Sequence, residues 1–289
     1  MKIAASELII NPDGSIYHLN LKPGEIATNI ITVGDPDRVD AITKYFEKIE
    51  VVTHKREFKT VTGSYKGNRL TVISTGIGTD NIDIVFTELD ALVNIDFETR
   101  TIKEAHTKLN FIRVGTSGAL LSNIDVGSII ISEMAIGLEG LMHFYERSET
   151  NDEKELEHSV NHMISIDGIK AYATTASEQL VNHFNKLGRR GITVTATGFY
   201  GPQGRQLRLK PRSRNFLDKI ADVKHHQLET TNLEMETAGI YGMAQILGHD
   251  AISLNAILAN RATKEFAENP KEVVEKLIVD TLEKITDLD

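Results

Sequence analysis

The 289-residue chain contains no cysteine, which excludes disulfide bonds, thiolate nucleophiles and cysteine-ligated metal sites. It also lacks any apolar run that approaches the roughly 20 residues of a membrane-spanning helix. The first residues lack the basic start and the long apolar stretch of a signal peptide. We therefore expect a cytoplasmic protein that has no association with a membrane.

Positive charge is also scarce, because 32 Lys and Arg residues stand against 41 Asp and Glu residues, for a net charge of −9. Binding of nucleic acid through counterion release needs a basic surface, so no nucleic-acid partner is expected. An anionic small molecule can still bind where arginines and backbone amides gather locally. The length suffices for a sizeable core, and no linker or internal repeat divides the chain, so we expect a single domain over residues 1–289.

Short β-rich apolar runs alternate with segments of helical periodicity. The predicted strands are 29–34, 69–75, 110–115, 128–133, 192–197 and 251–258. The predicted helices are 37–48, 81–93, 177–187, 232–247 and 270–285. This alternation predicts an α/β fold, a three-layer α/β/α sandwich with a central mixed β-sheet. The polar segments 95–108 and 146–158 are expected to be exposed loops or surface helix.

Three predicted strands run into glycine-containing turns, GDPDR (34–38), STGIGTDN (74–81) and RVGTSGAL (113–120). Ligands of open α/β sheets bind beyond the carboxyl ends of the strands, and glycine lets backbone N–H groups approach an anion. Side-chain donors on these turns are Arg38, Arg113, Thr116 and Ser117. Backbone geometry explains each turn alone, but together they predict an anion site. The missing third glycine of a dinucleotide fingerprint argues against a nicotinamide oxidoreductase, and no P-loop motif occurs.

Two further motifs carry groups suited to a sugar and a heterocycle. In NLEMETAG, Glu234 and Glu236 are predicted at the start of a helix, where they point apart and only one can enter a site. A carboxylate accepts hydrogen bonds from vicinal hydroxyls, and Met235 offers an apolar face; a solvated pair of glutamates is the alternative. In GFYGPQGR (198–205), turn chemistry explains the glycines and the proline but not the other residues.

The histidines show no metal-binding spacing, and the pair at 225–226 is expected at the surface. His18, an isolated histidine near the N-terminus, is by itself more typical of a structural residue than of a functional one.

With HKREF (54–58) and ANRATKE (259–265), these motifs occur in the order found in the nucleoside phosphorylase I family, which the chain resembles over roughly residues 15–285. The combination of RVGTSGA and EMETA is specific for the family, and FYxxQxR followed by NR points to its branch that acts on uridine. The resemblance implies a pentosyltransferase that splits uridine reversibly with phosphate into uracil and ribose 1-phosphate, in pyrimidine salvage. Deoxyuridine and thymidine remain open as substrates.

The resemblance also implies roles for individual residues. The phosphate would be bound by Gly34, Arg38, Arg113 and Thr116, with Arg56 from a neighbouring subunit. The ribose would contact Met235, Glu236 and His18, the last again from a neighbour. The base would contact Phe199, Gln203 and Arg205. The residues expected to act in catalysis are Arg113, Gln203, Arg205 and Glu236.

Family members place the active site at a dimer interface, so at least a homodimer with shared active sites is expected, while dimer and hexamer remain open. Phosphate would be the co-substrate and no organic cofactor is implied. A potassium site would use Glu57, Ile77 and Asn81, but Asn81 replaces the family's serine. The base loop also departs from the family, since this chain has FYGPQGR where the bacterial uridine enzymes have FYPGQER.

One alternative within the family and one from another functional class remain open at this point. A purine nucleoside phosphorylase of the same family needs an acid after the late strand, where this chain has Asn260 and Arg261. A water-using nucleosidase is disfavoured by the intact set of arginines for phosphate. A non-catalytic nucleoside-binding protein is the alternative from another functional class.

Overall fold

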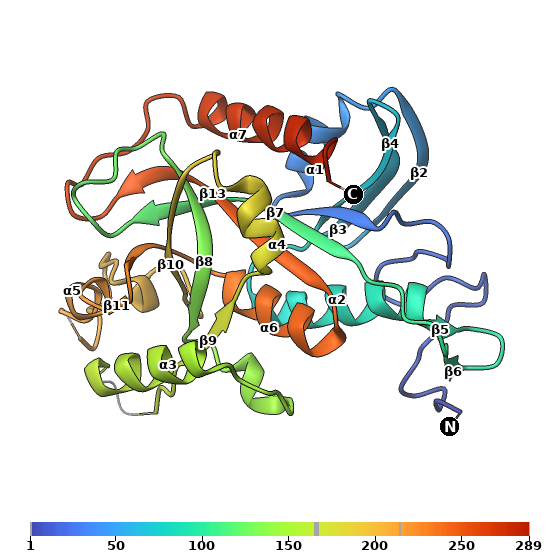
Figure 1. Ribbon diagram of the computed structural model, residues 1–289, viewed down its shortest axis with the longest axis horizontal. Coiled ribbons are helices and arrows are strands. Elements are labelled where there is room, and N and C mark those ends of the chain that lie inside the picture. The colour runs from blue at the N-terminus through green and yellow to red at the C-terminus, as the bar shows by residue number, and fades with distance from the viewer. Residues whose placement is uncertain (1, 165–167, 214, 289) are drawn as a thin grey trace.

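The computed structural model describes residues 2–164, 168–213 and 215–288 (Figure 1). The strands are β1 (Asn29–Val33), β2 (Lys48–Lys55), β3 (Phe58–Tyr65), β4 (Asn68–Ser74), β5 (Ile95–Asp96), β6 (Thr101–Ile102), β7 (Asn110–Ala119), β8 (Ile129–Gly137), β9 (Tyr172–Thr175), β10 (Arg189–Thr195), β11 (Lys224–His225), β12 (Leu228–Glu234) and β13 (Asp250–Asn260). The helices are α1 (Pro36–Thr43), α2 (Thr79–Asn94), α3 (Asn151–Met163), α4 (Glu178–Phe184), α5 (Phe216–Ala221), α6 (Thr237–Leu247) and α7 (Pro270–Ile285), with 3-10 turns η1 (Leu141–Phe144) and η2 (Gly201–Gln203).

A large mixed sheet forms the centre of the fold, as the sequence predicts. Its order is β11-β12-β10-β8-β13-β7-β1-β4-β3-β2, and β9 pairs with β8. Strand β1 runs parallel to β4 and β7, and β13 runs parallel to β7, whereas β2, β3 and β4 are antiparallel neighbours. Strand β12 also pairs antiparallel with β7, which closes β7, β13, β8, β10 and β12 into a ring. The central sheet thus rolls up at one end, beyond what strand patterns alone predict.

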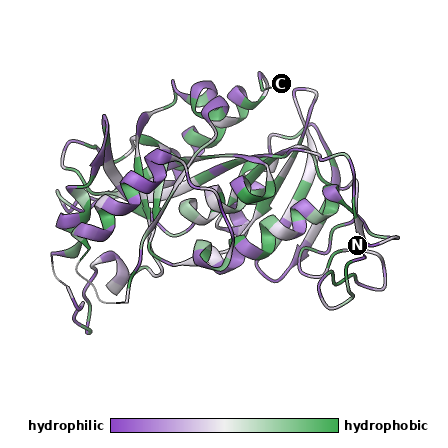
Figure 2. Ribbon diagram, turned by 60° about the horizontal axis from the view of Figure 1, so that its bottom comes forward, coloured by the Kyte–Doolittle hydropathy of each residue, from purple (hydrophilic) through white to green (hydrophobic). Residues whose placement is uncertain are grey.

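Helices cover the sheet on both sides. Figure 1 shows α1 and α7 on one side of the strands and α2 and α6 on the other. Hydrophobic residues gather on the central strands, while the helices carry hydrophobic and hydrophilic residues on different faces (Figure 2). The core contains fully buried side chains from several strands and helices, including Ile30, Phe86, Phe111, Ile252 and Leu277. Among the described residues, no helix is long and apolar enough to cross a membrane.

Several predicted boundaries are wrong, each for an identifiable reason. The predicted helix 37–48 ends at Thr43, and its last residue begins β2. The predicted helix 232–247 begins only at Thr237, because the residues up to Glu234 belong to β12 and pair with β10. The turn predicted after residue 115 lies inside β7, which continues to Ala119 because β13 and β12 pair with it there. Strands β2 and β3 were not predicted, since their many threonines and charged residues obscure the apolar pattern.

The two polar segments are largely exposed, as predicted. Segment 95–108 contains the short β5–β6 hairpin. Segment 146–158 leads into α3, where Thr150 and Glu153 form a reciprocal cap at the helix start. The surface position predicted for residues 225–226 holds for His226 but is wrong for His225, which is buried against α3. The prediction failed because β11 is too short to show a pattern.

Candidate active site

A single cleft of about 750 Å³ brings together most of the residues singled out in the sequence. It opens where the glycine turns, the GFYGPQGR loop and the β12–α6 junction meet. The predicted site residues that line it are Gly34, Arg38, Glu57, Ile77, Asn81, Arg113, Thr116, Phe199, Gln203, Arg205, Met235 and Glu236. The motifs lie far apart in the sequence, so their convergence is a property of the fold.

One end of the cleft is built for an anion. Helix α1 begins directly after Gly34, with Asp35 as its N-cap and Arg38 in its first turn. The backbones at Gly34 and Gly76 approach closely, since a Cβ at Gly34 would lie 3.5 Å from the Gly76 carbonyl oxygen. Arg38 donates from Nη1 to the carbonyl oxygen of Val114 at 3.3 Å, which aims its guanidinium toward β7. Burial and the positive charge of Arg113 lower the pKa of Arg38. A bound anion would relieve this repulsion.

Arg113 is buried and is held by three side chains. Its Nη2 lies 2.6 Å from Glu236 Oε2 and 3.1 Å from Glu234 Oε2, and its Nη1 donates to Asn255 Oδ1 at 2.8 Å. A Cβ at Gly115 would lie 1.6 Å from Nη1, so this glycine leaves the space in which the guanidinium folds back over its own strand. Steric demand by the Arg113 side chain therefore explains why Gly115, two residues after Arg113 in RVGTSG, is a glycine.

The convergence of Glu234 and Glu236 corrects a prediction. The sequence predicts both on a helix, pointing apart, with only one in the site. In the structure Glu234 ends β12 and Glu236 is the N-cap residue of α6, so the chain bends between them instead of forming a helix. Both carboxylates reach Arg113. Glu234 also accepts hydrogen bonds from the N–H groups of Glu236 and Thr237, which satisfies the start of α6.

The charges in this group stabilise one another. Burial alone would lower the pKa of Arg113, but the nearby carboxylates of Glu234 and Glu236 outweigh it and raise the pKa. Burial raises the pKa of Glu236, an effect that Arg113 opposes. Glu236 also accepts a hydrogen bond from the Gly78 N–H at 2.9 Å, which ties the STGIGTDN turn to the start of α6. The arginine that faces the anion end and the carboxylate that faces the cleft are thus one rigid unit.

The GFYGPQGR loop forms the other end of the cleft. Gln203 is 3% exposed, whereas Phe199 is 51% exposed and presents its ring to the cleft. The Arg205 guanidinium lies 3.7 Å from the centre of the Phe199 ring and donates to the Phe199 carbonyl oxygen and to Gln203 Oε1. Gly204, at φ 64°, provides the left-handed residue that ends η2 between the two polar side chains.

His18 and Arg56 stand apart from the other predicted residues, and neither lines this cleft. His18 Nδ1 lies 2.6 Å from Glu88 Oε1, and Glu88 also accepts the backbone N–H of His18. Arg56 is exposed, at φ 57° in the turn between β2 and β3. Its neighbour Glu57 does line the cleft, so Arg56 lies close to the rim.

Glu57, Ile77 and Asn81, the predicted cation residues, surround Gly76. A Cβ at Gly76 would lie 2.5 Å from Asn81 Nδ2 and 2.9 Å from Glu57 Cγ. The side chain of Ile77 is 69% exposed at the cleft mouth. The carboxylate of Glu57 and the amide of Asn81 are therefore close together. The amide stands where the family pattern has a serine hydroxyl.

Sequence reasoning assigned no role to several residues of the site. Asn255 holds Arg113, and its signal was an amide in the middle of a buried strand. Arg261, for which the sequence suggests no binding role, lies near Arg205. Burial together with the charge of Arg261 lowers the pKa of Arg205 to about 10. Asn260 is buried and its amide donates to the carbonyl oxygens of Leu121 and Ile124, so it is a structural residue.

A sequence model of the Phosphorylase superfamily matches residues 28–286. The chain belongs to this superfamily. The membership confirms the predicted resemblance to the nucleoside phosphorylases. The chain is 33% identical to the uridine phosphorylase of Thermococcus kodakarensis, over 92% of this chain and 85% of the relative. It is 29% identical to a DeoD-type purine nucleoside phosphorylase of Shewanella denitrificans, over 86% of this chain and 88% of the relative.

Solved structures of the superfamily share the fold. The Trypanosoma brucei nucleoside phosphorylase, described as showing uridine phosphorylase activity, superposes with a TM-score of 0.90 at 28% identity. The superposition covers 97% of this chain and 99% of that one. It confirms the predicted α/β fold with a central mixed sheet.

Proposed function

We propose that this superfamily member is a uridine phosphorylase, which converts uridine and phosphate reversibly into uracil and ribose 1-phosphate. The observation that carries the proposal is the unit of Phe199, Gln203 and Arg205 at one end of the cleft, opposite the arginines of the anion end. A flat ring with a buried amide and a guanidinium suits the face and the polar edge of uracil. Relatives named uridine phosphorylase support this choice.

The phosphate would lie between Gly34, Arg38, Arg113 and Thr116. Arg38 and Arg113 would neutralise its charge, and the start of α1 would add a favourable dipole. The ribose would lie between the two ends, with its hydroxyls on Glu236 and its apolar face on Met235. Because Arg113 is bonded to Glu236, the phosphate and the ribose would be positioned by one shared group.

In the reaction, a phosphate oxygen forms a bond to C1′ while the bond from C1′ to N1 of uracil breaks. The bonding electron pair leaves with uracil, so negative charge develops on the base while the sugar becomes cationic. Arg205 would stabilise the charge on uracil, with support from Arg261, and such donors contribute roughly 3–4 kcal/mol each. Positioning of phosphate against C1′ can contribute on the order of 7–11 kcal/mol. Gln203 would fix the orientation of the ring.

The late strand favours uridine over a purine nucleoside. Purine enzymes of the family would carry an aspartate there to protonate the base, and this chain has Asn260 and Arg261. The Asn260 amide is used by backbone carbonyls, and Arg261 adds positive charge next to Arg205. This charge suits an anionic leaving group that needs no proton.

The site would be completed by a second copy of the chain, in at least a homodimer. Arg56 is exposed next to the rim and does not line its own cleft, and His18 does not line it either. Exposed apolar side chains at the cleft mouth, Ile77 and Phe266, fit a surface that a partner covers.

A potassium ion would lie near Glu57 and Asn81. Its test compares activity in potassium chloride with activity in choline chloride, and equal rates would remove this ion from the proposal.

The proposal is tested by incubating the protein with uridine, deoxyuridine, thymidine, inosine and adenosine, each with and without phosphate. We expect phosphate-dependent release of base that is fastest from uridine. Faster release from inosine or adenosine would favour a purine nucleoside phosphorylase. Binding without turnover of any nucleoside would favour a non-catalytic nucleoside-binding protein.

A further inference from the structure

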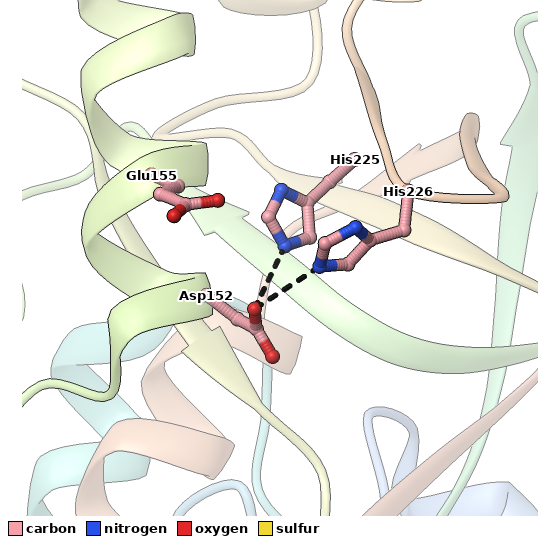
Figure 3. Close-up of side chains that lie close together, drawn as sticks. All are labelled: Asp152, Glu155, His225 and His226. Atoms are coloured by element: carbon pink, nitrogen blue, oxygen red, sulfur yellow. Dashed lines mark hydrogen bonds and ion pairs between the residues drawn. The ribbon is translucent and has the colours of Figure 1, made fainter.

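A second group of side chains lies where α3 meets the β11–β12 hairpin, at the end of β12 away from Glu234. Asp152 and Glu155 come from the first turns of α3. His225 ends β11, and His226 follows it in the hairpin turn. Figure 3 shows the imidazole rings beside the helix, with a nitrogen of each directed at the Asp152 carboxylate. The reaction proposed above uses none of these residues.

The distances between the polar atoms of these four residues are close to those between the ligand atoms of a metal site. Asp152 Oδ1 lies 3.1 Å from His226 Nε2 and 3.3 Å from His225 Nε2. Ligand atoms from these residues and Glu155 all lie within 4.8 Å of one another. In a tetrahedral zinc site with bonds of about 2.0–2.2 Å, neighbouring ligand atoms are about 3.3–3.6 Å apart. The cluster therefore needs only a small adjustment, mainly of Glu155, to surround one ion.

The hairpin turn explains how neighbouring histidines can share one ion. Successive residues of a regular strand point to opposite faces of the sheet. Here His225 pairs with Leu228, so residues 226 and 227 form the turn, and His226 adopts φ 51°. The two rings consequently lie on the same side, with their centres 4.1 Å apart (Figure 3).

His225 Nε2 provides an independent indication of a missing partner. The His225 side chain is 8% exposed, and within the described part of the chain its Nε2 has no hydrogen-bond partner. The contact with Asp152 is within ion-pair range but is too poorly aligned for a hydrogen bond. A buried imidazole nitrogen without a partner is costly, and a metal ion would satisfy it.

We propose that Asp152, Glu155, His225 and His226 bind one zinc ion, which links α3 to the β11–β12 hairpin. Imidazole nitrogen and carboxylate oxygen are ligands that Zn²⁺ accepts in four-coordinate sites. The two carboxylates balance the two positive charges of the ion. Magnesium and calcium prefer shells made of oxygen, so the two histidines select against them.

A second cluster, formed by Asp90, His106 and His249, is less suited to an ion. His249 Nδ1 accepts the Leu109 N–H at 3.2 Å, which places the imidazole proton on Nε2, the atom that faces Asp90. His106 Nε2 lies 3.0 Å from a backbone carbonyl oxygen and acts as a donor. Neither Nε2 atom can offer a lone pair to an ion, although His249 Nε2, like His225 Nε2, has no hydrogen-bond partner within the described residues.

The test is calorimetric titration of the full-length, tag-free protein with Zn²⁺, and with Mg²⁺ as the comparison ion. We expect one Zn²⁺ per chain and no binding of Mg²⁺ at the same concentrations. The variants Asp152→Asn and His226→Ala change exposed side chains, so the fold should survive. Each should weaken zinc binding at least tenfold. His158→Ala, which changes an exposed histidine on α3 outside the cluster, should bind zinc like the wild type.

Two further readouts separate a built site from loose binding to surface histidines. Cobalt(II), used in place of zinc, should give the intense visible absorption of a four-coordinate ion in the wild type and lose it in both variants. Zinc should raise the melting temperature of the wild type and of His158→Ala, but not of Asp152→Asn. Absence of zinc binding to the wild type, or wild-type affinity in Asp152→Asn or His226→Ala, would overturn the proposal.

Discussion

The guanidinium of Arg113 lies 2.6 Å from the carboxylate of Glu236, and both side chains are buried. One residue comes from a strand in the middle of the sheet and the other from the start of α6. The pair therefore joins the anion end of the cleft to the part proposed to hold the ribose. Its neutrality also lets both charged groups remain inside the protein.

Replacing Arg113 by methionine should destabilise the fold as well as abolish activity. The change leaves Glu234 and Glu236 buried without their cation, and such a loss costs about 3–5 kcal/mol. The free energy of unfolding from urea titration measures this cost. Arg190→Met is the control, because Arg190 pairs with Glu133 near the surface and its loss should cost less than about 1 kcal/mol. Equal stabilities of the two variants would contradict the buried network.

Glu236→Gln should impair catalysis more than stability. Glutamine keeps the shape and can still accept the Gly78 N–H, but it loses the charge that faces Arg113 and that is proposed to bind the ribose hydroxyls. Hydrogen bonds to a charged group contribute about 1.5–3 kcal/mol, so kcat/KM for uridine should fall by about 10- to 150-fold. Steady-state kinetics at saturating phosphate measure the loss. Unchanged kinetics would remove Glu236 from the ribose site.

Arg205→Ala should lower kcat/KM for uridine by more than about tenfold, because the stabilisation proposed for the leaving uracil by this positive charge is lost. Arg208→Ala is the matched control, since Arg208 is an exposed arginine of the same segment that does not line the cleft. It should keep nearly the full rate. If Arg205→Ala turned over uridine at the wild-type rate, the proposal that Arg205 binds the base would be wrong.

Gly115→Ala tests whether the glycine makes room for Arg113. The added Cβ would lie 1.6 Å from Arg113 Nη1, so the guanidinium must leave its position and turnover should fall sharply. Gly118→Ala lies on the same strand, and its Cβ would have no neighbour closer than 3.8 Å. This variant should therefore keep most of the activity. Similar kinetics of the two variants would show that Arg113 does not need its observed position.

The shared active site can be tested by mixing two inactive subunits. In a dimer of Arg56→Ala with Arg205→Ala, one of the two sites would combine an intact Arg205 with an intact Arg56 from the other subunit. Random pairing should then restore about a quarter of the wild-type activity on co-expression. If each site were formed by one chain, co-expression would restore nothing.

Most residues singled out by local sequence signals line one cleft, whereas the boundaries of several elements were predicted wrongly. The glycine turns and GFYGPQGR are short motifs whose chemistry is visible in a few adjacent residues, and the fold brings them to one cleft. The junction at Glu234 and Glu236 was misjudged, because the end of β12 at Glu234 depends on pairing of β12 with β10. Closure of the sheet through β7 and β12 depends on residues more than 100 positions apart, and no local pattern encodes it.

Phosphorolysis of uridine by this protein can be established by quantifying both products of the reaction at once. Purified protein is incubated with uridine with and without phosphate, and uracil, ribose 1-phosphate and free ribose are quantified. We expect equal amounts of uracil and ribose 1-phosphate, formed only when phosphate is present. Release of free ribose without phosphate, or no cleavage of uridine at all, would contradict it.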